Sequence, residues 1–175
     1  MTKSRGDQIV QEEKKILSEL MKNSKENIDV IAKRCGISRQ RVYKIIKNME
    51  KNQKIWGYSA IADTEKQGLE KFIVFFKQSP LVLDKKTADK INLEEIKKNY
   101  LELDITIETS HYIQGKYDWI IIFTAKDIKH AKKFLNLLQY KYPGLIKNEN
   151  LAQILYTPRD HCILNPDYLK VKDFI

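Results

Sequence analysis

The sequence predicts an α+β protein with an N-terminal winged helix-turn-helix domain and a C-terminal ferredoxin-like domain. Apolar residues recur at helical spacing through residues 7–49. Beyond residue 70, short apolar strands and helices follow in the order β-α-β-β-α-β. Charge also divides unevenly: residues 1–60 carry 14 Lys and Arg against 7 Asp and Glu, whereas residues 61–175 carry 18 against 16. The first part alone is strongly basic, as a domain that meets a polyanion should be.

The first element is predicted as a helix from about Asp7 to Lys22. Its apolar residues form one helical stripe: Ile9, Ile16, Leu17, Leu20 and Met21. The polar sequence NSKEN, residues 23–27, ends this helix. We therefore expect three helices that share one core.

Residues 28–49, IDVIAKRCGISRQRVYKIIKNM, carry two short helical patterns joined by a turn. The first pattern has an apolar stripe at i, i+3, i+4 and i+7: Ile28, Ile31, Ala32 and Cys35. Gly36 follows it, where a left-handed backbone costs glycine little, and the Ser38 hydroxyl can cap the next helix. This arrangement is typical of a helix-turn-helix.

The second pattern leaves basic and polar side chains on one exposed face. Its inward stripe is Val42, Ile45, Ile46 and Met49, and its outward residues are Arg39, Gln40, Tyr43, Lys44 and Lys47. Those outward side chains suit contacts with DNA grooves and phosphates. The alternative is a three-helix unit that serves protein contacts or stability only.

Residues 54–61, KIWGYSAI, are β-prone and predict a short strand or wing, with Gly57 permitting a bend. Lys54 and Tyr58 would touch the DNA backbone. The polar sequence that follows has no long apolar stripe. We therefore expect a DNA-binding domain at residues 1–62 and a linker at residues 63–69.

The second domain is expected at residues 70–157. Its first strand, KFIVFF at residues 71–76, is continuously apolar, as in a strand buried on both faces. A loop at residues 79–86 precedes a helix that Asn92 and Glu95 would cap. The stripe of that helix is Leu93, Ile96 and Tyr100.

The remaining elements complete the β-α-β-β-α-β order. A strand with alternating residues, Ile105, Ile107, Thr109, His111 and Ile113, is followed by a turn at residues 115–118, GKYD, and the strand WIIIFTA. Asp127 can cap a helix whose inward residues are Ile128, Ala131, Phe134, Leu135 and Leu138. Pro143-Gly144 ends that helix before a strand at residues 146–157. Residues 158–175 form a C-terminal extension.

A ferredoxin-like sheet has helices on one face, so its other face needs cover. A second copy of the chain is the simplest cover, which predicts a dimer. The alternative is a monomer whose C-terminal extension shields that face.

Several other classes of protein are disfavoured. The longest apolar runs, FIVFF and WIIIF, are far shorter than the roughly 20 residues of a membrane-spanning helix, and the polar N-terminus is unlike a signal peptide. Cys35 and Cys162 form no C-x-x-C pair, so we expect neither a zinc site nor a disulfide and place the protein in the cytoplasm. His111, His130 and His161 are scattered, with His130 on a solvated helix face. No catalytic motif occurs, so we expect no enzyme activity, metal or cofactor.

The motifs IAKRCGIS, the helix through Met49, KIWGY and GKYD resemble the leucine-responsive regulatory protein/AsnC family, also called feast/famine regulators. The resemblance extends over nearly the whole chain. It implies a transcription regulator that binds DNA as a dimer or as a larger ring such as a tetramer or octamer. It also implies regulation by a small molecule, commonly an amino acid, bound between effector domains.

The same resemblance implies roles for individual residues in DNA binding. The segment from Ser38 to Lys47 would read DNA, with Ser38 and Arg41 near phosphates. Four residues would lie nearest the base edges: Arg39, Gln40, Tyr43 and Lys44. Gln40 suits adenine and Arg39 suits guanine.

Gly115 and Asp118 match the G-x-x-D turn beside the family's effector site. The resemblance implies that Thr109, His111 and Tyr112 lie close by. An amino acid needs an acceptor for its ammonium group, and Asp118 could supply it. The alternative is an ordinary hairpin turn in which Asp118 bonds backbone amides.

Three features depart from the family pattern: Ile45 stands where Arg is common, the loop after the first strand is long, and the chain extends beyond residue 157. Two other functions share parts of this plan. One is a tetrapyrrole decarboxylase of the haem pathway, whose helix-turn-helix is degenerate, and the other is an amino-acid sensor without DNA binding. The intact basic helix argues against the decarboxylase.

Overall fold

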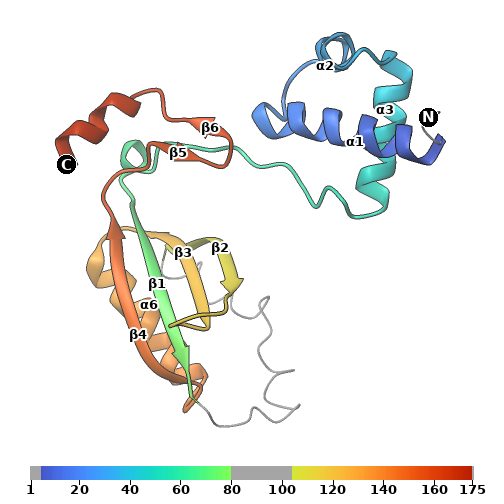
Figure 1. Ribbon diagram of the computed structural model, residues 1–175. Helices are drawn as coiled ribbons and strands as arrows, with labels where there is room; N and C mark the ends of the chain where they lie inside the picture. The colour runs from blue at the N-terminus through green and yellow to red at the C-terminus, as the bar shows by residue number, and fades with distance from the viewer. Residues whose placement is uncertain (1–4, 80–103, 175) are drawn as a thin grey trace. The chain divides into compact units, whose positions relative to one another are not determined.

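The computed structural model describes residues 5–79 and 104–174 of the chain (Figure 1). The chain divides into two compact units. The first consists of Met1–Ile61 together with Thr157–Ile175, and the second of Ala62–Tyr156.

The first unit contains three helices around one core, as predicted: α1 (Arg5–Lys22), α2 (Ile28–Cys35) and α3 (Arg39–Lys51). The buried residues of this core are Ile16, Leu20, Ile31, Ala32, Cys35, Val42, Ile45, Ile46 and Met49. The predicted stripe of α1 is only partly buried, because Ile9 and Met21 near its two ends are exposed. An eight-residue helix spans about 12 Å and an eighteen-residue helix about 27 Å, so α2 cannot cover α1 along its whole length.

The turn between α2 and α3 is built from backbone conformations that the sequence indicated. Asn27 caps α2 by accepting a hydrogen bond from the Asp29 amide at 2.9 Å. Gly36 ends α2 with φ 68°, a left-handed conformation that favours glycine. Ser38 is the N-cap of α3, but the prediction that its hydroxyl caps the helix is wrong. The first turn of α3 is exposed, so water can satisfy its free N–H groups instead.

The strand predicted for residues 54–61 is also wrong. The Lys54 and Ile55 amides both donate to the carbonyl of Met49, and Ile55 packs against the three-helix core. After Ile55 the chain has no partner strand within the described residues, and a strand cannot form without one. The predicted linker contains a short 3-10 helix, η1 (Glu65–Gln67), which ends at Gly68 with φ 69°.

The second unit contains a four-stranded antiparallel sheet with the order β2-β3-β1-β4, the strand order of a ferredoxin-like fold. Its elements are β1 (Glu70–Gln78), β2 (Thr106–Tyr112), β3 (Trp119–Ala125), α6 (Ile128–Lys141) and β4 (Ile146–Ile154).

The helix predicted around Asn92–Tyr100, and all but the first residue of the loop predicted before it, lie outside the described residues. The C-terminal extension forms a hairpin of β5 (Arg159–Asp160) and β6 (Ile163–Leu164), followed by the 3-10 helix η2 (Tyr168–Phe174).

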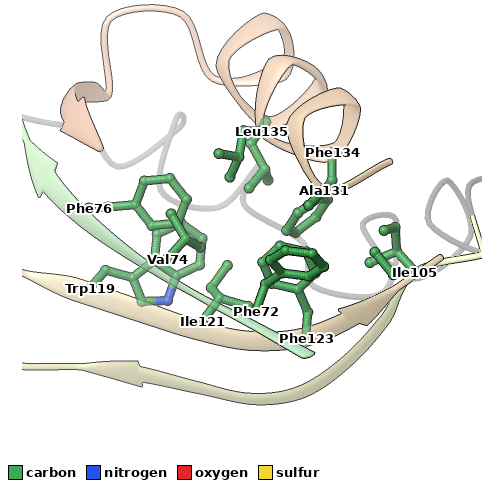
Figure 2. Close-up of a cluster of buried hydrophobic side chains, with 12 residues drawn as sticks. Phe72, Val74, Phe76, Ile105, Trp119, Ile121, Phe123, Ala131, Phe134 and Leu135 are labelled. Carbon is green, nitrogen blue, oxygen red and sulfur yellow. The ribbon is translucent and has the colours of Figure 1, made fainter. Parts of the chain in front are cut away.

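The helix α6 covers one face of this sheet (Figure 1). Aromatic rings fill the layer between them: Phe123 stacks with Phe72 at 5.7 Å and meets Phe134 of α6 at 4.7 Å between ring centroids (Figure 2). At the other end of the layer, Phe76 and Trp119 lie 5.0 Å apart. Four of the five inward residues predicted for α6 are buried: Ala131, Phe134, Leu135 and Leu138.

Two details at the start of α6 differ from expectation. Ile128 is exposed, because it lies in the first turn, beyond the buried part of the helix. Asp127 caps α6 as predicted, accepting from the His130 amide at 2.8 Å. His130 is not simply solvated, since its ring Nδ1 lies 2.7 Å from Asp127 Oδ1. The hydrogen bonds to His130 hold the pKa of Asp127 below its ordinary value.

Strand β1 is not buried equally on both faces, contrary to the prediction. Phe72, Val74 and Phe76 are fully buried on the side of α6, whereas Ile73 and Phe75 on the opposite side are half-buried. Only the α6 side of the strand has a covering layer within the described residues. We refer to the opposite side of this sheet as its open face.

Strand β2 does not keep the predicted alternation, because its register with β3 shifts between Ile107 and Thr109. Ile107 pairs with Phe123 on the α6 side, but Thr109 pairs with Ile122, which points to the open face. The shift inserts one extra residue, as a β-bulge does, and turns the rest of the strand over. Thr109 and His111 therefore lie on the open face instead of sharing a side with Ile107.

Replacing Phe134 with Ala should destabilise the second unit by about 3–5 kcal/mol, because it leaves a cavity among closely packed rings. Chemical denaturation monitored by circular dichroism measures the change. Tyr140→Ala, at an exposed position of the same helix, is the matched control and should change the free energy of unfolding by less than about 0.5 kcal/mol. Equal effects of the two substitutions would contradict the packing described here.

Candidate nucleic-acid interface

The buried stripe of α3 determines which of its side chains face outward. Successive residues of a helix are about 100° apart, so the direction opposite Val42 and Met49 is centred between Gln40 and Lys44. The residues around that direction are all exposed: Gln40, Tyr43, Lys44, Lys47 and Lys51.

Lys51 is a member of this face that the sequence prediction missed. The helix was expected to end near Met49, whereas it continues to Lys51. The spacing of four residues from Lys47 and seven from Lys44 is the signal that could have identified it. The outward face is thus longer and more basic than predicted.

Arg39 and Arg41 lie at the two edges of α3 instead. The Arg39 Nε atom is 3.5 Å from Asp29 Oδ1 of α2, and the Arg39 side chain remains 70% exposed. The Arg41 Nε atom donates to Glu12 Oε2 of α1 at 2.7 Å. The Glu12 side chain is only 13% exposed, so the structure holds Arg41 against α1 and apart from the outward face.

A hydrogen-bonded network connects α3 with the chain that follows it. Lys47 Nζ donates to Glu50 Oε2 at 2.8 Å, and the Tyr58 hydroxyl donates to Glu50 Oε1 at 3.0 Å. Lys47 Nζ also lies 5.9 Å above the Tyr43 ring, within cation–π range. The hydrogen bond between Lys47 and Glu50 lowers the pKa of Glu50 and raises the pKa of Lys47.

The basic residues differ in how far they are already neutralised. Lys54 Nζ donates to Glu13 Oε2 of α1 at 2.6 Å, so Lys54 is held like Arg41. Among the residues that the structure describes, Lys44 and Lys51 form no ion pair. Their charges are immediately available to a phosphate.

Comparisons with known proteins match this arrangement. A family model of winged helix-turn-helix DNA-binding domains matches residues 13–55, which include α2, α3 and the start of the following segment. The leucine-responsive regulatory protein of Haemophilus influenzae is 26% identical over 136 residues, 75% of each chain. The chain is thus similar to regulators of the leucine-responsive regulatory protein/AsnC family.

Solved structures show that the fold of this family extends over both units. An AsnC family transcriptional regulator from Agrobacterium tumefaciens superimposes with a TM-score of 0.66 at 19% identity, over 90% of this chain and 97% of that one. A transcriptional regulator from Neisseria meningitidis, solved in complex with L-Met, gives 0.62 at 12% identity, over 96% and 99%. The predicted resemblance to this family and the predicted fold class are confirmed.

The structure explains Ile45, one of the departures from the family resemblance. It lies in the buried stripe of α3 and contributes to the three-helix core. Isoleucine adds packing there, at a position where the resemblance led us to expect Arg, and Ile45 is not part of the outward face.

The five residues that the family resemblance assigned to an effector site do not form one cluster in the structure. Thr109 and His111 lie on the open face of the sheet, but the Tyr112 ring stacks on Trp119 at 5.8 Å on the other side. Gly115 lies in the turn between β2 and β3, where an added Cβ would meet no atom within 4 Å.

Asp118, the fifth residue, is already engaged. Its carboxylate accepts from Lys77 Nζ and from the Gln78 amide, both at 2.9 Å. The hydrogen bonds to Lys77 and Gln78 hold the pKa of Asp118 below its ordinary value of 3.8. The carboxylate faces the end of β1, and it bonds a backbone amide there, not amides within its own turn.

Thr109 is the unusual polar residue of this region. Its Oγ1 atom is buried and has no hydrogen-bond partner in the described structure. A buried hydroxyl without a partner is uncommon in folded proteins.

Some features that would indicate other classes of protein are not found. Over residues 5–79 and 104–174, no helix is long and apolar enough to cross a membrane. The same residues contain no cluster of His, Cys, Asp or Glu that could hold a metal ion. Cys35 and Cys162 are free thiols, and burial raises the pKa of Cys35.

Replacing Asp118 with Asn should destabilise the chain at neutral pH and have little effect in acid. The folded state lowers the pKa of this carboxyl, so its contribution is present above 3.8 and is lost as pH falls through the lowered pKa. Urea unfolding of both proteins at pH 7 and at the lowest pH that keeps the chain folded measures the difference. Asp173→Asn, at an exposed position, is the control. A gap between wild type and Asp118→Asn that stays constant with pH would contradict the ion pair.

Proposed function

We propose that this protein regulates transcription by binding operator DNA through the outward face of α3. The observation that carries the proposal is that a helix with one side buried in a three-helix core presents Gln40, Lys44 and Lys47 together on its other side. An exposed recognition helix of this kind enters the major groove, where amide and basic side chains meet base edges and phosphates. Similarity to winged helix-turn-helix domains and to a leucine-responsive regulatory protein supports it.

The DNA contact that we propose for each side chain depends on the ion pairs and hydrogen bonds that it already makes. Gln40 reads a base edge, with adenine as its best partner. Arg39 is mostly exposed and only loosely paired with Asp29, so it is free to reach a guanine. The Ser38 hydroxyl makes no cap hydrogen bond and is available to a phosphate. Arg41 would first have to leave Glu12.

Tyr43, Lys44 and Lys47 complete the proposed interface. Lys44 meets a phosphate directly, because it forms no ion pair within the described chain. Lys47 exchanges Glu50 for a phosphate, and the Tyr43 ring beneath it keeps its ammonium near the groove.

We propose that the protein acts as a dimer in the cytoplasm and that the open face of the sheet is the interface. That face carries Ile73, Phe75, Ile120 and Ile122, which remain half-buried in the single chain. A second copy would remove this apolar surface from water. It would also supply a second recognition helix for the other half of a two-fold operator. Larger rings would be assembled from such dimers.

Within this proposal the domains are residues 1–62 for DNA binding, 63–69 as linker, 70–157 for effector binding and oligomerisation, and 158–175 as extension. The effector is an amino acid held where two open faces meet. Thr109 Oγ1 lacks a partner on that face and could bond the ligand. An ammonium group at Asp118 would have to compete with Lys77. The complex of the Neisseria meningitidis regulator with L-Met supports this ligand class.

Replacing Gln40 with Ala should relax sequence preference by about 1–3 kcal/mol, the usual value of a bidentate base contact. Gel-shift titration of the DNA upstream of the gene, compared with a base-substituted copy, measures the preference. Gln139→Ala removes the same side chain from α6 in the other unit and is the control. Unchanged discrimination would refute the role of Gln40. Failure of the wild-type protein to bind DNA would refute the proposed function.

Replacing Phe75 with Glu should convert the protein to a monomer, because it buries a charge in the proposed interface. Light scattering should show half the mass, and operator affinity should fall about a hundredfold or more, since the two recognition helices are no longer linked. Tyr140→Glu changes an exposed aromatic residue of α6 in the same way and is the control. A Phe75→Glu protein of unchanged mass would place the interface elsewhere.

A further inference from the structure

Trp56 is the most exposed large hydrophobic residue in the described chain, with 96% of its surface accessible. An indole is large and mostly apolar, and it is normally withdrawn from water when it has no partner. Trp56 lies five residues after the end of α3, in the segment that was expected to form a wing. Its exposure calls for a physical explanation.

The exposure is not caused by a loose chain, because residues on both sides of Trp56 are tied to the helices. Before it, the Lys54 and Ile55 amides donate to the Met49 carbonyl at 2.8 and 3.2 Å. The Lys54 ammonium is also bound by Glu13. After it, Tyr58 is hydrogen-bonded to Glu50 of α3. The short segment between these contacts therefore presents the indole from a held position.

The charge around this segment identifies the class of partner. Lys47 and Lys51 stand on the last two turns of α3, Lys54 follows them, and Tyr58 is bonded to the same Glu50 that pairs with Lys47. Lys51 forms no ion pair among the described residues, so the surroundings are basic. A second copy of the chain would bring like charges together here, whereas a phosphate backbone is attracted.

We infer that Trp56 packs against the sugar-phosphate backbone of DNA beside the groove that α3 enters. The flat face of the indole suits a deoxyribose, and its Nε1–H donates to a phosphate oxygen. The Glu50 carboxylate acts through Tyr58 as a positioning residue that keeps the segment beside the helix. This inference rests on the proposed DNA binding and adds to it a contact that carries no sequence information.

The first test compares variants of the full-length protein in DNA titrations. Trp56→Ala should weaken binding about tenfold, as expected for one lost aromatic contact to nucleic acid. Trp56→Phe should lose less. The loss should be equal for operator and unrelated DNA, and the salt dependence should not change, because no charge is removed. Lys51→Ala, in contrast, should lower the slope of log K against log salt by about one.

Tyr140→Ala is the matched control, because Tyr140 is an aromatic residue that is 84% exposed on α6, in the other unit. It should leave DNA affinity unchanged. A Trp56→Ala protein that binds both DNAs as tightly as wild type, while Gln40→Ala loses discrimination, would overturn the role of Trp56 and leave the proposed function standing.

Fluorescence provides the second test, because the sequence contains only two tryptophans. Trp119 is 3% exposed and serves as a buried background, and the spectrum of Trp56→Phe can be subtracted to isolate Trp56. Operator DNA should protect Trp56 from quenching by acrylamide. Full quenching in the DNA complex would overturn the contact. Protection that grows with protein concentration in the absence of DNA would also overturn it and assign the surface to a second copy. No DNA binding by the wild type would overturn the proposed function as well.

Discussion

The burial of four apolar side chains fixes the rotation of α3 about its axis, and every feature of the candidate interface depends on that rotation. Val42, Ile45, Ile46 and Met49 each contribute roughly 1.5–3 kcal/mol by leaving water. Turning the helix by one residue would expose part of this stripe and bury charged side chains in its place, Lys47 and Glu50 in one direction or Arg41 and Lys44 in the other. The outward direction of Gln40 and Lys44 is therefore set by the core on the opposite side of the helix.

Carboxylates of α1, α2 and α3 pair with some of the cations on α3 and just after it, and leave others unpaired. Glu12 and Glu13 of α1 hold Arg41 and Lys54, while Lys44 and Lys51 keep unneutralised charges. Exposed ion pairs of this kind add little to stability in general. Their effect is to fix the orientation of the paired side chains. They also reduce the number of unneutralised positive charges on the surface around α3.

The sequence was sufficient to predict elements that local pattern determines. Helical spacing identified the inward stripe of α3, and Gly36 and Asp127 were identified as caps because local chemistry makes them so. The sequence was not sufficient where contacts between distant segments determine the structure. The register shift in β2 depends on how β3 pairs with it, and the pairing of Arg41 with Glu12 depends on how two helices cross. Residues 54–61 have strand-like composition but no partner strand within the described chain.

The two glutamates of α1 have a consequence for how such a protein can change over generations. They lie on α1, outside the outward face of α3, yet each binds a cation on α3 or just after it. Loss of either carboxylate would release an arginine or a lysine and strengthen the attraction to any nucleic acid. Under the proposed function, the strength of DNA binding can thus evolve through α1 while the choice of bases remains with α3.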